Sequence, residues 1–240
     1  LTPLGEKIAN KAQSISIEMN NVLDIAKSAQ DHMFGETRLG VIPTIAPYIL
    51  PRLMPKIRKK YNSVSLKLVE DQTANILNML YAGNLDLVLI ARPYKVENLH
   101  VELIKKDYFH VALPKENPLA RTKKKSLSNK DISNSNILLL DEGHCLRDHA
   151  LQACSKEAKQ KIDAFKATSL LTLVQMVANN SGITLLPDLV INSELLKSSK
   201  IKILDYENNK NYREIAICWR VSTPRSKDFS KFADFLKINI

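Results

Sequence analysis

The sequence lacks any apolar run long enough to cross a bilayer. Its longest uninterrupted runs, Leu87 to Ala91 and Ile215 to Trp219, are far shorter than the roughly 20 residues that a spanning helix needs. The first residues also lack the charged, apolar and small-residue series of a signal peptide. We therefore expect a cytoplasmic protein with no membrane partner. Because Leu1 leads directly into a helical pattern, we also expect the sequence to be a piece of a longer protein.

The basic charge of the chain lacks the pattern of a nucleic-acid groove. The sequence holds 35 Lys and Arg against 25 Asp and Glu, a formal net charge of +10, and clustered basic residues bind phosphates. The basic residues are scattered, however, apart from Lys56 to Lys60 and Arg121 to Lys125, and neither cluster is interleaved with aromatic residues. This distribution favours a solvated surface over a DNA or RNA groove in this chain itself.

Cysteine is scarce, with three residues and no Cys-x-x-Cys pair or His and Cys cluster at zinc spacing. Because cytoplasmic thiols are kept reduced, this argues against a structural disulfide framework, and any pair that forms is more typical of redox chemistry. We expect no metal and no bound cofactor. Cys218 lies inside an apolar stretch and is predicted to be a core residue.

Residues 4–30 are predicted to form one long amphipathic helix. Apolar residues recur every seven positions, with a second set offset by four: Ile8, Ile15, Val22 and Ala29, then Ala12, Met19 and Ala26. Such a helix packs against its own domain or pairs with a second chain. The strict seven-residue repeat is typical of a coiled-coil seam and favours dimerisation.

The remaining chain alternates strands and helices. Strands are predicted at Arg38–Ile42, Val64–Val69, Leu85–Ile90, Val101–Ile104, Phe109–Leu113, Ile137–Leu140, Gly182–Leu186, Ile201–Leu204 and Arg213–Arg220. Helices are predicted at Ala46–Tyr61, Ala74–Ala82, Leu146–Cys154, Leu170–Asn179 and Lys227–Ile238, with a polar loop from Pro114 to Lys130. This order predicts an α/β fold with a mostly parallel sheet. Two α/β subdomains, joined by strands near Val111 and Ile217 with a ligand cleft between them, fit it best.

The segment from His144 to Cys154 places a thiol near each end of one predicted helix. Cysteines nine residues apart in a helix lie roughly 13 to 14 Å apart along its axis, whereas a disulfide needs Cα atoms within about 7 Å. A disulfide would therefore force the helix to unwind, as in a redox switch. Cys145, at the expected helix start near Arg147, is the better thiolate, and Cys154 the resolving thiol. The alternative, that both are small core residues, stays open.

Several motifs resemble those of LysR-type transcriptional regulators that sense hydrogen peroxide. They are Gly143-His-Cys-Leu-Arg-Asp148 followed by Ala150-Leu151 and Cys154, Leu39 to Pro51, Ala167 to Leu170, Ser181 to Pro187, and Leu1-Thr-Pro-Leu-Gly5, which resembles the start of the family's linker helix. The resemblance covers nearly the whole chain. Its cysteine motif is specific, because most LysR-type regulators lack it.

The resemblance implies a periplasmic-binding-protein-like (type 2) regulatory domain. Residues 1–33 would form a linker and dimerisation helix, residues 36–112 and 217–240 regulatory subdomain I, and residues 113–216 regulatory subdomain II with the redox cysteines. A winged helix-turn-helix domain that binds promoter DNA would precede this chain. Members act as homodimers and homotetramers with RNA polymerase, activate oxidative-stress genes and are not enzymes.

The resemblance also implies a chemistry for the two cysteines. The Cys145 thiolate would attack hydrogen peroxide to give a sulfenic acid, and Cys154 would condense with it to a disulfide. Refolding of the segment between them would alter how the oligomer packs and so change transcription. Glutathione or a glutaredoxin would reverse the reaction.

The supporting residues implied by the resemblance are Thr44, Thr73, His144, Arg147, Asp148 and Arg213. The threonines match residues that help to place peroxide, although their positions also suit helix N-caps. His144, Arg147 and Asp148 match polar neighbours of the reactive cysteine, whereas by residue type alone each reads as exposed. Arg213 matches a family arginine less closely, because Asn211 and Tyr212 depart from its usual context. His149 stands where glutamine is common.

Two other functions remain as alternatives. One is a LysR-type effector domain or solute-binding module that takes a small metabolite without redox chemistry. The other is a thiol peroxidase, which would consume peroxide continuously with a reductant.

Overall fold

The computed structural model describes residues 1–28, 36–61, 65–154, 162–193, 196 and 200–240. The chain divides into two compact units. The first unit comprises Leu1–Ile90, Lys95–Lys105 and Ala216–Ile240, and the second comprises Ala91–Tyr94 and Lys106–Ile215. Strands β4 (Leu99–Pro114) and β10 (Tyr212–Arg220) contribute residues to both units.

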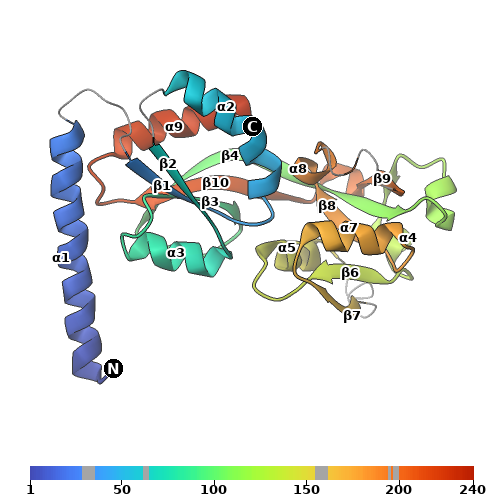
Figure 1. Cartoon of the computed structure of the whole chain (residues 1–240). Helices are drawn as coiled ribbons and strands as arrows, with labels where there is room; N and C mark the ends of the chain where they lie inside the picture. Colours follow the sequence, from blue (N-terminus) through green and yellow to red (C-terminus); the bar gives the residue numbers. More distant parts are fainter. Residues whose placement is uncertain (29–35, 62–64, 155–161, 194–195, 197–199) are drawn as a thin grey trace. The chain divides into compact units, whose positions relative to one another are not determined.

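The first unit is a sheet covered by helices on both faces. Its elements are α1 (Pro3–Ser28), β1 (Glu36–Val41), α2 (Ala46–Lys60), β2 (Ser65–Glu70), α3 (Thr73–Tyr81), β3 (Leu87–Arg92) and α9 (Ser226–Asn239), with parts of β4 and β10. The strand order is β2-β1-β3-β10-β4, and β1 is parallel to both β2 and β3. Helices α2 and α9 cover one face of this sheet and α3 covers the other (Figure 1).

The core of the first unit lies between the sheet and these helices. Strand β3 reads Leu-Val-Leu-Ile-Ala and is buried on both faces, as expected for a parallel strand between two helical layers. Gly40 on β1 lets α3 approach closely, because a Cβ there would lie 2.6 Å from Leu85 Cδ1 and 3.1 Å from Ile76 Cβ. The alternation of strands and helices predicted for this part of the chain is confirmed.

The second unit is a mixed α/β arrangement. Its strands are β5 (Ser126–Leu127), β6 (Ile137–Leu140), β7 (Ile162–Ala167), β8 (Thr184–Pro187) and β9 (Ile201–Tyr206), with parts of β4 and β10. Its helices are η1 (Pro118–Arg121), α4 (Asn129–Ile132), α5 (Cys145–Ala153), α7 (Leu170–Ala178), α8 (Asp188–Ile191) and η3 (Glu207–Asn209). Strand β4 is antiparallel to β8 and β9, whereas β5 is parallel to β9 and β6 to β7.

The second unit and strand β4, which runs into it from the first unit, depart from the sequence expectations in three respects. The strands predicted at Val101–Ile104 and Phe109–Leu113 are one continuous strand, because the polar residues between them keep an extended backbone. The segment read as a polar loop from Pro114 to Lys130 contains η1, β5 and the start of α4. Strand β7 was not predicted. The prediction of a mostly parallel sheet is confirmed for β1 with β2 and β3 but is wrong for β4, which is antiparallel to β8 and β9.

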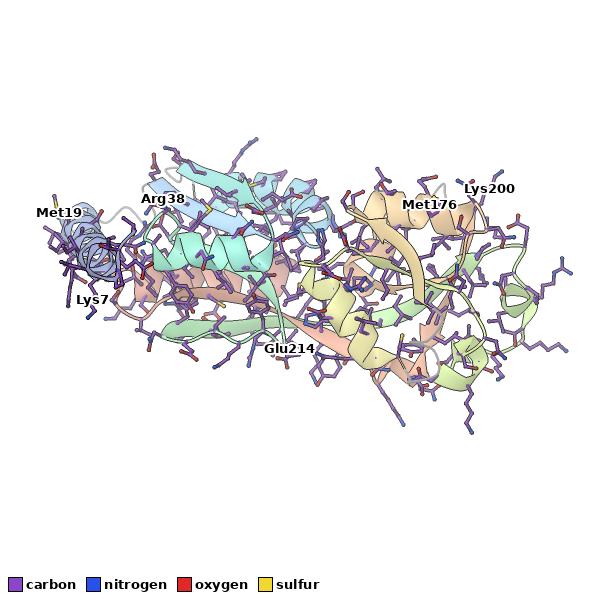
Figure 2. The ribbon with its side chains drawn as sticks, turned by 90° about the horizontal axis from the view of Figure 1, so that it is seen from below. Lys7, Met19, Arg38, Met176, Lys200 and Glu214 are labelled. Carbon is purple, nitrogen blue, oxygen red and sulfur yellow. The ribbon has the colours of Figure 1, made fainter. Side chains whose placement is uncertain are left out.

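Helix α1 carries the predicted apolar seam. Residues 29 and 30, which the prediction included, and the side chain of Ala26 lie outside the described residues. Ile8, Ile15, Met19 and Val22 are each more than 60% exposed, and Figure 2 labels Met19. Among the described residues no helix, α1 included, is long and apolar enough to cross a membrane.

Candidate functional site

The turn between β6 and α5 sets the direction of the cysteine helix. Asp141 accepts a hydrogen bond at Oδ1 from the Glu142 backbone N–H at 2.8 Å, and its own N–H donates to the Ala167 carbonyl at 2.8 Å. Gly143 has a φ of 89°, a left-handed conformation that residues with a Cβ rarely adopt. The glycine of the Gly-His-Cys motif is therefore required by the turn that leads into the helix.

Cys145 is the first residue of α5. The preceding N-cap residue, His144, makes no side-chain capping bond to the first turn. The Cys145 side chain is only 6% exposed and lies where the positive partial charge of a helix amino end favours a thiolate. All three cysteines are thiols, so this is the reduced form of the protein.

Cys154 lies directly after the last residue of the same helix. Its backbone N–H donates to the Ala150 carbonyl at 3.1 Å, and its side chain is 6% exposed. The helix predicted at Leu146–Cys154 is confirmed with a shift of one residue, as Cys145–Ala153. At about 1.5 Å of rise per residue the two cysteines are roughly 13 to 14 Å apart along the axis, beyond the reach of a disulfide.

The polar residues around Cys145 differ in exposure. His144 is buried, and this burial lowers its pKa, although the Asp141 carboxylate acts in the opposite direction. Arg147 is half-buried and donates from Nη1 to the Leu140 carbonyl at 3.1 Å, at the end of β6. Asp148 is exposed. The reading of all three as solvated is therefore wrong for His144 and Arg147, because the turn packs them against the end of β6.

His149 is a site residue that sequence reasoning treated only as a minor change. Its side chain is 4% exposed, and Nε2 lies 3.0 Å from the Pro93 carbonyl. Burial lowers the pKa of His149, the Pro93 carbonyl and Asp148 oppose this, and Arg213 adds to it. A neutral ring that donates from Nε2 leaves Nδ1 as an acceptor, and Nδ1 has no partner among the described residues. Because His149 follows Cys145 by four positions, both side chains lie on one face of α5.

A buried ion pair lies beside this face of α5. Arg213 on β10 and Asp107 on β4 are both 0% exposed, and Arg213 Nε lies 2.8 Å from Asp107 Oδ2. The other carboxylate oxygen accepts from the Leu189 N–H at 3.0 Å, which ties α8 to the pair. The positive charge of the Arg213 guanidinium also contributes to the lowered pKa of His149. Asp107 was missed, although a lone carboxylate beside the apolar stretch of a strand was a signal that a buried cation lay opposite.

The two threonines belong to the first unit. Thr44 lies in the turn before α2, and Thr73 is the first residue of α3. Each follows by three positions a residue of the paired parallel strands, Val41 of β1 and Glu70 of β2. Both therefore lie at the carboxyl edge of the sheet, where α/β proteins commonly bind ligands.

Neither threonine is a helix N-cap. The N-cap residues are Ile45 for α2 and Gln72 for α3, and neither makes a side-chain capping bond. The N-cap reading is therefore wrong, since the N-cap residue of each helix lies one position away from the threonine. Both threonines are 2% exposed, and the Thr73 hydroxyl has no hydrogen-bond partner among the described residues.

No metal centre is found in the parts of the chain that the structure describes. Within them, no group of three or more His, Cys, Asp and Glu side chains is placed to hold an ion.

Comparison with known proteins gives consistent matches. Residues 30–239 match the family described as the LysR substrate binding domain. The chain is 36% identical over 237 residues to the HTH-type transcriptional regulator EstR of Acinetobacter baylyi. This match covers 99% of this chain and 78% of EstR. It is 35% identical over 239 residues to a Streptomyces viridosporus protein named "Probable hydrogen peroxide-inducible genes activator", covering 99% of this chain and 76% of that protein.

Solved structures match the fold as well. The reduced regulatory domain of OxyR2 from Vibrio vulnificus superimposes with a TM-score of 0.80 at 34% identity, covering 87% of this chain and 97% of that domain. The predicted fold class, an α/β regulatory domain of the type 2 periplasmic-binding-protein-like kind, is thereby confirmed. The dimerisation role of α1 stays a prediction.

Proposed function

Because the chain belongs to the LysR family of transcriptional regulators and is homologous to its hydrogen-peroxide-responsive OxyR members, we propose that it is the redox-sensing part of a transcription regulator. Its relatives are transcriptional regulators, which supports a regulatory rather than an enzymatic role. Hydrogen peroxide is the proposed signal.

The observation that carries this proposal is the placement of two buried thiols at opposite ends of α5. In the reduced form they are too far apart to bond, so a disulfide requires α5 to unwind. Oxidation is thereby coupled to a change of structure, which is what a sensor needs and a structural thiol pair does not.

The proposed chemistry has two steps. The Cys145 thiolate attacks one oxygen of hydrogen peroxide, which gives a sulfenic acid and releases hydroxide. The Cys154 thiol then attacks the Cys145 sulfur and water leaves as the disulfide forms. A thiol reductant such as glutathione, alone or through a glutaredoxin, is proposed to return both thiols.

Supporting roles are proposed for the polar residues that the family resemblance indicates. Thr44 and Thr73 are assigned to binding peroxide or its water, and the buried hydroxyl of Thr73, which has no partner in the part of the chain that the structure describes, supports this. His144, Arg147 and Asp148 are assigned to orienting the Cys145 thiolate and protonating the leaving hydroxide. Arg213 acts from its buried pair with Asp107 and supplies a fixed positive charge.

The assembly is proposed from the exposed seam of α1. Pairing of two α1 helices would bury Ile8, Ile15, Met19 and Val22, which are exposed in the single chain. Promoter DNA would be bound by a winged helix-turn-helix domain outside this sequence, and RNA polymerase would be the downstream partner. Refolding of α5 would change how regulatory dimers pack in a tetramer.

The test uses reduced protein and stoichiometric hydrogen peroxide. Alkylation of the remaining thiols followed by mass spectrometry should find a disulfide between Cys145 and Cys154, with Cys218 still a thiol as the internal control. Circular dichroism should show a loss of helical signal on oxidation, because α5 unwinds. The sensor proposal fails if stoichiometric peroxide leaves both cysteines as thiols.

A metabolite-binding effector domain is the second candidate. It is favoured by one observation, the match of residues 30–239 to a family described as the LysR substrate binding domain. It predicts that a small ligand raises the melting temperature and that Cys145→Ser has no effect on regulation.

A thiol peroxidase would instead consume many equivalents of peroxide per chain in the presence of a reductant.

A further inference from the structure

The carboxyl end of α5 is held by a buried tyrosine from β9. Tyr206 is 0% exposed, and its hydroxyl lies 2.8 Å from the Ala153 carbonyl oxygen and 2.8 Å from Asn129 Oδ1. Asn129 Nδ2 donates to the same Ala153 carbonyl at 3.3 Å. Because Ala153 is the last residue of α5, both side chains bond to the last turn of the helix.

The same hydroxyl also contacts the resolving cysteine. Tyr206 shares a side-chain hydrogen bond with Cys154. Burial, with added contributions from Cys154 and Glu207, raises the pKa of Tyr206 far above its usual value, so the hydroxyl keeps its proton at neutral pH. Asn129 is fixed in turn, since its backbone N–H donates to the Glu207 carboxylate. The network therefore joins β9, α4 and the end of α5.

Disulfide formation has to break this network. Cys154 cannot reach Cys145 while α5 is helical, so the last turn must leave the Tyr206 hydroxyl. Release breaks the bonds that the buried Tyr206 hydroxyl and the half-buried Asn129 amide make to the Ala153 carbonyl, and losing bonds at buried polar groups is unfavourable. The reduced form is thus stabilised at the thiol that reacts second.

We propose that Tyr206 and Asn129 form a latch on the resolving cysteine, which limits how fast and how completely Cys154 condenses with oxidised Cys145. The inference rests on the proposed function. The latch acts on the second step only, in which the Cys145 sulfenic acid and the Cys154 thiol give a disulfide and one water. Tyr206 is a positioning residue, and the attack of Cys145 on peroxide, at the other end of α5, does not involve it.

The test compares Tyr206→Phe, which keeps the ring and removes the hydroxyl, with Tyr212→Phe, which removes the hydroxyl of an exposed tyrosine of the same unit. The first step is timed by trapping the sulfenic acid with dimedone in a Cys154→Ser background. The second is timed by acid quenching, alkylation and mass spectrometry. We expect Tyr206→Phe to speed disulfide formation about threefold to tenfold, the effect of one or two hydrogen bonds, and to leave the first step unchanged.

A second readout needs no redox chemistry. In the reduced protein, hydrogen exchange at the Cys154 amide, which bonds to the Ala150 carbonyl, should be about threefold to tenfold faster in Tyr206→Phe than in the wild type or Tyr212→Phe. If Tyr206→Phe does not fold, as judged by circular dichroism, Asn129→Ala removes the second side chain of the latch and takes its place.

The outcomes separate this inference from the proposed function. A wild-type protein that forms no Cys145 to Cys154 disulfide refutes the proposed function, while wild-type exchange rates in Tyr206→Phe refute the latch. Faster exchange with unchanged disulfide formation also overturns the inference. Faster exchange together with faster disulfide formation, and with neither change in Tyr212→Phe, supports it.

Discussion

The two ends of α5 differ in what holds them. The amino end starts from a glycine turn, has no side-chain cap, and lies beside an imidazole nitrogen of His149 without a partner among the described residues. At the carboxyl end, the Tyr206 hydroxyl and Asn129 Nδ2 both donate to the Ala153 carbonyl. The end of α5 that is proposed to react with peroxide is therefore the end without a side-chain cap, whereas side-chain hydrogen bonds hold the end that carries the resolving cysteine.

The largest expected effect comes from replacing each thiol in turn. Cys145→Ser should abolish oxidation at stoichiometric peroxide, because Cys154 lies in the latch and not at the helix start. Cys154→Ser should keep the first step and accumulate a sulfenic acid, which dimedone labels and mass spectrometry detects. Equal loss of the reaction in both variants would contradict the division of roles between the two ends.

The buried pair of Arg213 and Asp107 should have the largest effect on stability. Arg213→Met leaves the Asp107 carboxylate buried without its cation and should lower the free energy of unfolding by about 3 to 5 kcal/mol, measured by urea denaturation. Lys67→Met, which breaks an exposed pair with Glu36, is the matched control and should change it by less than about 1 kcal/mol. Adding Asp107→Leu to Arg213→Met should recover much of the loss; no recovery would contradict the charge-burial explanation.

The helix between the cysteines was predictable from sequence because its evidence is local. The Gly143 turn, the helix start at Cys145 and the spacing to Cys154 are all set by residues next to one another. The same holds for the alternating elements of the first unit, where apolar strands and amphipathic helices follow in order. Strand β7 escaped prediction because Asp163 and Lys166 interrupt its apolar pattern.

The residues that contact α5 and its neighbours from elsewhere in the fold could not be predicted, because they lie far away in the chain. Tyr206 meets Ala153 across 53 positions and Asn129 across 77, and Arg213 meets Asp107 across 106. His149 was underrated for the same reason, since its burial depends on Pro93, 56 positions away. Residue types suggested exposure, and tertiary packing overrode them.

The glycine turn should have an intermediate effect, confined to the amino end. Gly143→Ala places a Cβ on a residue with a φ of 89° and should destabilise the protein by about 1 to 2 kcal/mol in urea denaturation. It should also slow the first step, because α5 then starts in a shifted position. Hydrogen exchange at the carboxyl end of α5 should not change. Gly5→Ala, in the helical backbone of α1, is the control and carries no such strain.

The smallest expected effect is a pH dependence at the amino end. The pKa of His149 is lowered by burial, so below its ordinary value of about 6.5 the unfolded chain takes up a proton before the folded chain does. Stability from this group is therefore complete above about pH 6.5 and is lost as the pH falls toward the folded pKa. His149→Gln should lose less stability than the wild type between about pH 8 and about pH 5, by urea denaturation. His144, whose pKa is also lowered, remains in both proteins and contributes the same background.

The carboxyl end should not respond, because the Tyr206 hydroxyl keeps its proton throughout this range, so Tyr206→Phe should follow the wild-type pH profile. A pH profile altered by Tyr206→Phe and not by His149→Gln would reverse the assignment of the two ends.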